Sequence, residues 1–385
     1  MHIERLYPAY KDHLWGGNKL KAHYGKSTPL TPCAESWELS LHQGGLTCLA
    51  DGTPLASRLT PLTLGQNAAS LPAFPVMIKL IDAKESLSVQ VHPADAYARE
   101  RGSVYGKTEL WYIVEAEAGA GVYIGFSRDV TREEYEAAIR EGHLLELLNF
   151  YPVKGGESYL IPAGTVHAIG RGCLVCEVQQ SCDLTYRIFD YGRKDKNGKQ
   201  RELHVDQALQ VTDLCRYRPV TLPNGLLGCH RCFQTRLLCV QNAYTAATNG
   251  ESFHVLNCVR GAGAINGQEI AAGDSFFIPA NDVTYTLTGE MTLLLTEIRK
   301  YYLDVTVEKA LVSASVTDDR GAVLFTEARQ SKAPSKRDTA SLAAALCSAA
   351  LSRLALTPAD ITDIRIQAPD GQEELRARIA ERIKT

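Results

Sequence analysis

Residues 156–167 read Gly156-Glu-Ser-Tyr-Leu-Ile-Pro162-Ala-Gly164-Thr-Val-His167. The run Ser-Tyr-Leu-Ile has the apolar character of a short strand, Pro162 and Gly164 indicate a turn, and a second strand opens with His167. A strand, a turn and a returning strand that begins with histidine are typical of a double-stranded β-barrel. In such a barrel the late histidine comes back beside residues of earlier strands. We therefore expect a mainly β protein in which His167 meets partners from the N-terminal part of the chain.

These partners are expected in Ser88-Val-Gln90-Val-His92-Pro93 and at Glu109. Gln90 and His92 are two residues apart in an alternating segment, so both side chains leave the same face of a strand. Glu109 and His167 are expected on neighbouring strands. Two imidazoles and a carboxylate form the ligand set of a catalytic zinc ion, which keeps one position open, and the Gln90 amide oxygen offers a fourth ligand. Although each residue taken singly is more often structural, their combination predicts one Zn²⁺ per chain.

Four further segments occur in an order that is known from one family. They are Trp15-Gly16-Gly17, Glu35-Ser36-Trp37-Glu38-Leu39-Ser40, Phe74-Pro75 and Leu184-Thr-Tyr-Arg187-Ile-Phe-Asp190-Tyr-Gly-Arg193. With the metal motifs, they resemble the type I mannose-6-phosphate isomerases of the cupin superfamily, in the compact bacterial form. The resemblance covers residues 1–298. It implies a zinc-dependent enzyme that interconverts mannose 6-phosphate and fructose 6-phosphate through a cis-enediol.

The resemblance also implies roles for residues around the metal ligands. Lys107 leaves the same strand face as Glu109 and is expected to point into the metal pocket, with a solvated surface lysine as the alternative. Arg187 matches the active-site arginine of the family. Glu177 is the candidate for relaying the proton or positioning the substrate, and its alternative is a buried structural partner of Arg187.

Lys79 and Ser88 match family positions that line the sugar-phosphate pocket. A lysine suits phosphate as a point charge, and a serine suits it as a short hydrogen-bonding group. A rival class, an iron-dependent oxygenase, commonly uses a His-x-Asp/Glu motif, whereas position 94 is Ala and Glu109 follows His92 by 17 residues. A non-catalytic sugar-phosphate sensor or scaffold remains the alternative function, but it predicts losses among the pocket residues, and all of them are present.

Composition adds limits rather than an identity. The chain has 385 residues, of which 45% are hydrophobic and 22% charged, with a net charge of −3, which is typical of a globular protein in solution. No basic run with interleaved aromatic residues predicts nucleic-acid binding, and no apolar stretch of about 18 residues predicts membrane insertion.

The 11 cysteines are an odd number scattered along the chain, which favours a reducing compartment, so we expect a cytoplasmic protein. Two pairs, Cys173/Cys176 and Cys229/Cys232, have Cys-x-x-Cys spacing. We interpret them as core thiols rather than as a structural zinc site, because the pairs lie far apart along the chain.

The predicted architecture is mainly β, with two cupin-type (jelly-roll) β-barrels, a helical insertion and a small C-terminal α+β module. Residues 1–215 form the metal-binding catalytic cupin domain, with early strands expected at 36–41, 45–49, 75–81, 87–91 and 109–114. Its helical insertion lies near 128–150, where Thr131 and Glu134 have capping-box spacing.

Residues 216–299 are expected to form a second cupin domain that repeats the strand, turn and strand rhythm of the first. Where the first copy carries His167, the second carries Val283 or Thr284. His254 is a lone imidazole nearby, and a single imidazole is more often structural. This domain is therefore predicted to be free of metal.

Residues 300–385 are predicted to form a ββαβα extension with a first strand pair around an Asp/Gly turn, a helix over 338–356 and a last helix over 370–384. The order resembles a truncated, degenerate start of a sugar kinase of the repressor/kinase (ROK) family. Asp304-Val-Thr-Val lacks the glycines that let a phosphate approach the backbone, so no kinase activity is expected. We predict a scaffold or interface role, with the Ala/Leu-rich helix as a homodimer surface.

Overall fold

The computed structural model describes residues 2–194, 198–223, 225–331, 335–369 and 372–384. The chain divides into two compact units, each with its own core. The first consists of Met1–Pro219 and Thr235–Glu297, and the second of Val220–Gln234 and Ile298–Thr385. Val220–Gln234, which the sequence analysis assigned to the second cupin domain, thus groups with the C-terminal residues.

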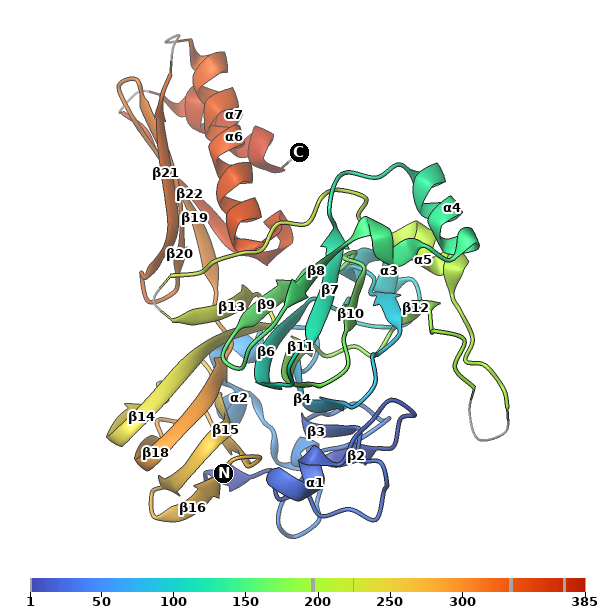
Figure 1. The fold of residues 1–385 in the computed structure, drawn as a ribbon. Coiled ribbons are helices and arrows are strands. Elements are labelled where there is room, and N and C mark those ends of the chain that lie inside the picture. The colour runs from blue at the N-terminus through green and yellow to red at the C-terminus, as the bar shows by residue number, and fades with distance from the viewer. Residues whose placement is uncertain (1, 195–197, 224, 332–334, 370–371, 385) are drawn as a thin grey trace. The chain divides into compact units, whose positions relative to one another are not determined.

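The N-terminal part of the first unit is built from two antiparallel sheets (Figure 1). One has the order β2 (Ala9–Lys11), β3 (Glu35–Leu39), β4 (Val76–Ala83), β11 (Cys173–Gln180), β6 (Glu109–Ala116) and β9 (Ser158–Ile161). The other has the order β12 (Tyr186–Phe189), β5 (Val89–Val91), β10 (His167–Ile169), β7 (Gly121–Phe126) and β8 (Leu148–Pro152). The mainly β prediction is confirmed.

A shared apolar core joins these two sheets. Trp111 and Val175 of the first sheet cluster with Val122 and Ile124 of the second, and all four side chains are fully buried. Because alternate residues of a strand face opposite sides, the inward positions of β6, β7 and β11 supply this layer. Burying such side chains stabilises the fold by about 1.5–3 kcal/mol each, so the sheets form a fixed frame for any polar group held between them.

Among the early strands, the one predicted at 45–49 is wrong. Cys48 forms only isolated bridges, to Tyr7 and Pro54. The apolar run there packs Leu49 into the core without a continuous partner strand.

The helices of the first unit are short and lie between strands. They are α1 (Lys19–His23), α2 (Pro61–Ala69), α3 (Asp95–Arg99), α4 (Arg132–Glu141) and α5 (Val205–Val211). At α4 the predicted capping box is present, with Thr131 accepting from the Glu134 amide and Glu134 accepting from the Thr131 amide. Tyr135 anchors this helix in the core against Phe126.

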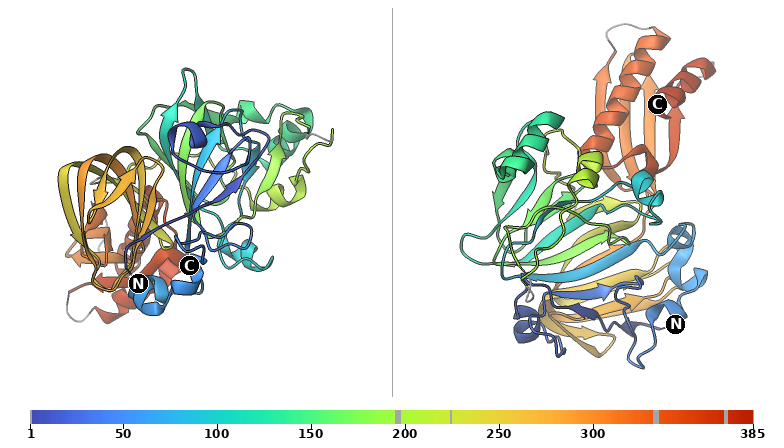
Figure 2. Two further views of the ribbon diagram at one scale, coloured as in Figure 1. Left: turned by 90° about the horizontal axis from the view of Figure 1, so that it is seen from below. Right: turned by 90° about the vertical axis from the view of Figure 1, so that its right-hand side faces the viewer.

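Most strands of the third sheet of the first unit come from residues 216–299, where the sequence predicts a repeat of the first domain. Its order is β1 (Glu4–Arg5), β17 (Ser275–Ile278), β15 (His254–Ile265), β18 (Thr284–Glu297) and β14 (Phe233–Ala247), with β16 (Gln268–Ala271) paired to β15. In Figure 2 (left), β14 to β18, coloured yellow to orange, curve around one another, and their buried side chains form one core. His254 is buried there, with Nδ1 2.9 Å from the Tyr285 hydroxyl and Nε2 3.5 Å from Glu297.

The second unit contains a four-stranded sheet that is covered by helices. Its order is β21 (Val323–Gln330), β20 (Leu311–Asp318), β19 (Tyr301–Glu308) and β22 (Ile361–Gln367), and β22 runs parallel to β19. Both α6 (Lys336–Leu354) and α7 (Glu373–Lys384) lie on one face of the sheet (Figure 1), and β13 (Leu226–His230) also belongs to this unit. Positions 370 and 371, where the last helix was predicted to begin, lie outside the described residues.

The strand count predicted for the extension is corrected. The segment interpreted as one first strand, from Tyr302 to Asp318, is a hairpin of β19 and β20 that turns at Lys309. Lys309 adopts a left-handed backbone conformation, with φ of 56°. Because glycine or asparagine usually marks this conformation, the turn carries no sequence signal. In the described residues the order is therefore βββαβα.

Across the described part of the chain, no helix is both long and apolar enough to span a membrane.

Candidate metal centre and active site

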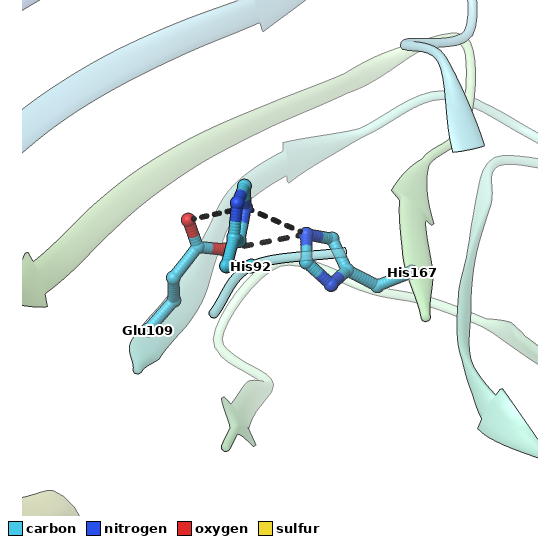
Figure 3. Close-up of side chains that lie close together, drawn as sticks. All are labelled: His92, Glu109 and His167. Carbon is cyan, nitrogen blue, oxygen red and sulfur yellow. Dashed lines mark hydrogen bonds and ion pairs between the residues drawn. The ribbon is translucent and has the colours of Figure 1, made fainter. Parts of the chain in front are cut away.

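The three predicted metal ligands converge between the two N-terminal sheets (Figure 3). His92 directly follows β5, Glu109 opens β6 and His167 opens β10. Their ligand atoms all lie within 4.8 Å of one another, and all three residues are buried. Of the two residues expected on neighbouring strands, His167 lies on β10 next to β5, opposite Gln90, but Glu109 does not, because β6 belongs to the other sheet. Alternation gives the face of a strand but does not say which sheet the strand joins.

The two imidazoles are held in one tautomer by the backbone. Nδ1 of His92 lies 3.0 Å from the Leu184 carbonyl oxygen, and Nδ1 of His167 lies 2.8 Å from the Thr165 carbonyl oxygen. A carbonyl only accepts, so both Nδ1 atoms donate. Burial lowers the pKa of His92 to about 3 and lowers that of His167. Both rings are therefore neutral, and each Nε2 presents a lone pair to the centre.

The protein donors near these lone pairs are the Lys107 ammonium, 3.0 Å from His92 Nε2, and the Gln90 side-chain nitrogen, 3.4 Å from His167 Nε2. The two Nε2 atoms are 3.1 Å apart, and Glu109 carboxylate oxygens lie 3.2 Å from His92 Nε2 and 3.6 Å from His167 Nε2. Glu109 Oε2 is buried without a hydrogen-bond partner. Acceptors that face one another repel unless a cation lies between them. Imidazole donation to backbone carbonyls is also the usual orienting contact behind a metal ligand, so the residues fit a divalent metal ion.

Gln90 and Lys107 complete the surroundings of the three ligands. Gln90 pairs with His167 across β5 and β10, and its side-chain amide lies 3.4 Å from His167 Nε2. The Lys107 ammonium contacts Glu109 Oε1 and lies 3.0 Å from His92 Nε2. Burial alone would raise the pKa of Glu109, but the Lys107 ammonium beside it lowers that pKa well below its ordinary value. Glu109 is therefore an anion at neutral pH.

A cavity of about 360 Å³ opens beside this centre. The sequence-predicted residues that line it are Lys79, Ser88, Gln90, Lys107, Glu177 and Arg187. The structure thus gathers the candidate residues in one place, with the three metal ligands behind Gln90 and Lys107.

Glu177 faces the cavity from β11, directly opposite Lys79 on β4 and Trp111 on β6. Its Oε2 accepts from the Trp111 indole at 3.0 Å, and its Oε1 lies 3.4 Å from the Lys79 ammonium. Burial, followed by the Glu109 charge, raises its pKa. A buried carboxylate whose pKa is raised is a stronger base than a solvated one.

Arg187 does not pair with Glu177. It lies on β12 opposite Gln90 of β5, and its Nη1 donates to the Glu202 carbonyl at 2.9 Å. Its Nε is buried and has no hydrogen-bond partner. The alternative of a structural Glu177–Arg187 pair is therefore not supported by the described contacts.

Several cavity residues were missed by the sequence analysis. His13, Asp183 and Arg201 line the cavity as single polar residues in loops, without a motif that marks them, and Thr185 lines it from within the quoted segment that begins at Leu184. Trp15, Glu35 and Trp37 also line it, and they were quoted as family segments without a role. Glu35 accepts from the Trp37 indole at 2.6 Å.

Two family models match parts of the chain. Residues 3–112 match the family model for the catalytic domain of type I phosphomannose isomerase, and residues 232–298 match the cupin domain of mannose-6-phosphate isomerase.

Two relatives and one solved structure illustrate the similarity. The chain is 33% identical over 313 residues to the probable mannose-6-phosphate isomerase GmuF of Bacillus subtilis, and this alignment covers 75% of this chain and 97% of that relative. It is 39% identical over 204 residues to the mannose-6-phosphate isomerase of Streptococcus mutans, and this alignment covers 51% of this chain and 64% of that relative. The crystal structure of mannose 6-phosphate isomerase from Bacillus subtilis superimposes with a TM-score of 0.70 at 29% identity, over 77% of this chain and all of that one.

A mainly β chain with a cupin domain and a buried site suited to a metal ion defines the class of metal-binding cupin enzymes. The chain belongs to the type I mannose-6-phosphate isomerase family and is an enzyme of that family.

Proposed function

We propose that this chain interconverts mannose 6-phosphate and fructose 6-phosphate with one Zn²⁺ ion at His92, Glu109 and His167, and with Gln90 as a further ligand. The observation that carries the proposal is the pair of His92 and His167 Nε2 lone pairs facing the Glu109 carboxylate in a buried site. Two imidazoles and one carboxylate favour zinc with an open position. When bound, zinc would offset the negative charge that develops on the substrate oxygens.

The protein side chains have separate roles in proton transfer, charge stabilisation and substrate binding. In this proposal Glu177 removes the proton from C2 of the aldose and returns it to C1, with a cis-enediol between the two steps. The Lys107 ammonium stabilises negative charge on the substrate oxygens, and the buried surroundings strengthen that effect by excluding water. Arg187 supports it from the opposite wall of the cavity, with its partner-free Nε as a donor. Lys79 orients Glu177, and Ser88 hydrogen-bonds the substrate.

The parts of the chain have separate proposed roles. We assign the catalytic site to a first jelly-roll cupin domain, residues 1–215, with its helical insertion. We assign a metal-free structural role to a second cupin domain, residues 216–299. We assign a scaffold role to residues 300–385, a kinase-like but degenerate module with a homodimer surface on α6.

The only partner that we propose besides a second copy is the sugar phosphate, with no nucleic acid or membrane. Cytoplasmic location is proposed because all eleven cysteines are free thiols, as a reducing compartment would keep them.

The proton route is testable by following mannose 6-phosphate in D₂O by NMR with zinc-loaded protein. We expect fructose 6-phosphate carrying solvent deuterium at C1, because a proton held on Glu177 can exchange with solvent. Glu177→Gln should abolish conversion, whereas Glu133→Gln makes the same chemical change on the exposed surface of α4 and should not. Conversion by Glu177→Gln at the wild-type rate would remove Glu177 from the proton route. No conversion by the zinc-loaded wild type would favour the non-catalytic sugar-phosphate sensor.

A further inference from the structure

The cationic side chains around the cavity are unequally neutralised. Lys107 contacts Glu109, Lys79 lies 3.4 Å from Glu177, and His13 lies 3.5 Å from Glu35. Each of the two ammonium groups therefore has a carboxylate partner of its own within the site, and so does the His13 imidazole, whose pKa burial lowers. The cavity wall formed by β12 and the residues after it is different.

Two guanidinium groups contact one buried carboxylate on that wall, and the charge of a third acts on the same cluster. Asp190 is 6% exposed and accepts from Arg201 Nε at 2.8 Å and from Arg193 Nε at 3.1 Å. Arg187 contributes a third guanidinium group and has no ion pair among the described contacts. Two positive charges are thus left without a buried partner. Burial, followed by the neighbouring Arg201 charge, lowers the pKa of Arg187.

The three arginines differ in what they can still bind. Arg193 has a structural role, because besides Asp190 it also contacts the Ser86 carbonyl, to which its Nη1 donates at 2.6 Å. It does not line the cavity. Arg201 lines the cavity, and only its Nε and Nη2 are occupied, both by Asp190. Its Nη1 has no partner among the described residues. Asp190 thus fixes the Arg201 guanidinium and leaves one edge of it available.

The order of these groups matches the shape of a sugar phosphate. Arg187 lies opposite Gln90 in the β12–β5 pair, one strand from the metal ligands, and Arg201 is held by Asp190, which follows β12. A phosphate monoester carries a charge of about −1.5 to −2 at neutral pH. Guanidinium groups match phosphate oxygens in geometry and charge better than an ammonium that is already paired.

We propose that Arg201, with Arg187, binds the phosphate of the substrate, and that Asp190 is a positioning residue that holds Arg201 for this contact. The inference rests on the proposed sugar-phosphate function, and it moves the phosphate away from Lys79, which orients Glu177 instead. The carbon chain then extends from the phosphate at Arg201 to the reacting carbons at the metal centre.

The test is the equilibrium binding of D-glucitol 6-phosphate to zinc-loaded protein by titration calorimetry. This probe carries the phosphate but no carbonyl, so its binding does not depend on turnover. Arg201→Gln should raise its Kd by about 10- to 100-fold, which corresponds to the loss of a charge-assisted hydrogen bond. Lys79→Gln removes the same charge from the same cavity and should raise the Kd less. Arg140→Ala, on the exposed surface of α4, should leave it unchanged.

Kinetics with mannose 6-phosphate provide a second readout. Arg201→Gln should raise KM by a factor similar to the Kd change while kcat falls much less, and Arg201→Lys should recover part of the affinity because it keeps the charge but not the fork. A Kd for Arg201→Gln within about threefold of the wild type would overturn the proposal, as would an equal or larger effect of Lys79→Gln. If the wild type binds the probe through Arg201 but does not isomerise the sugar, the phosphate site stands and the proposed isomerase activity fails.

Discussion

Lys107→Met separates the charge of Lys107 from its volume at the metal centre. Glu109 is fully buried and ionised, and in the metal-free protein the Lys107 ammonium is its only cationic partner among the described ion pairs, since both neighbouring imidazoles are neutral. Methionine keeps the apolar stem but removes the ammonium. Breaking a buried ion pair from one side typically costs about 3–5 kcal/mol, because the remaining charge stays buried. The metal-free variant should lose unfolding free energy of that size.

Zinc should restore most of this loss. A bound divalent ion places positive charge beside Glu109, so the variant should then lose only about 1 kcal/mol, the value of one ordinary hydrogen bond. The lowered pKa of Glu109 determines how the stability of the metal-free protein changes with pH. Stability that depends on the ionised carboxylate is present above its ordinary pKa and is lost as pH falls through the lowered pKa. The penalty of Lys107→Met should therefore shrink on strong acidification.

The assay is urea unfolding followed by tryptophan fluorescence, with chelator or with one equivalent of zinc. All three tryptophans, Trp15, Trp37 and Trp111, belong to the first compact unit, so the signal reports that unit alone. Lys84→Met, at an exposed position, is the matched control and should change little. A loss below about 1 kcal/mol without metal, or the same large loss with and without zinc, would refute the charge argument.

Other consequences concern stability and thiol reactivity. Burial and a neighbouring carboxylate raise the pKa of Glu177, so the folded state loses stability as pH rises through that pKa. Metal-free Glu177→Gln should therefore resist urea better than the wild type at about pH 8. The difference in unfolding free energy between the two proteins should shrink towards about pH 4. An equal gap at both pH values would contradict this sign. Gly16→Ala should cost about 1–3 kcal/mol in the same assay, because its Cβ would lie 2.2 Å from Ala34 Cβ; an unchanged midpoint would exclude that overlap. In a native thiol titration the exposed Cys215 and Cys239 should react first. Simultaneous reaction of all eleven cysteines would contradict the burial of eight of the others, Cys48 being half-buried.

Much of the part of the chain that holds the candidate site was predictable because its signals are local. Alternation placed Gln90 and His92 on one face, and the Thr131–Glu134 capping box marked the start of α4. The strand, turn and strand pattern before His167 also corresponds to β9 and β10. Each of these features depends on neighbouring residues, so a single sequence contains the information.

The remaining features depend on contacts between distant segments. The sheet that β6 joins is decided by pairing with β9 and β11, not by the sequence around Glu109. The hairpin at Lys309 has no glycine to mark it. Arg201 lies in a charged loop, lines the cavity and is held there by Asp190, which is distant from the metal motifs in the sequence. No pattern within that loop distinguishes it from a solvated arginine.

The most direct test of the proposed function is a coupled assay of mannose 6-phosphate conversion to fructose 6-phosphate with zinc-loaded protein, the same protein after chelation, and Arg187→Ala. The proposal predicts turnover that disappears on chelation, returns with zinc and collapses in the Arg187 variant. Turnover that survives complete removal of metal, or no turnover by protein with one bound zinc ion, would contradict it.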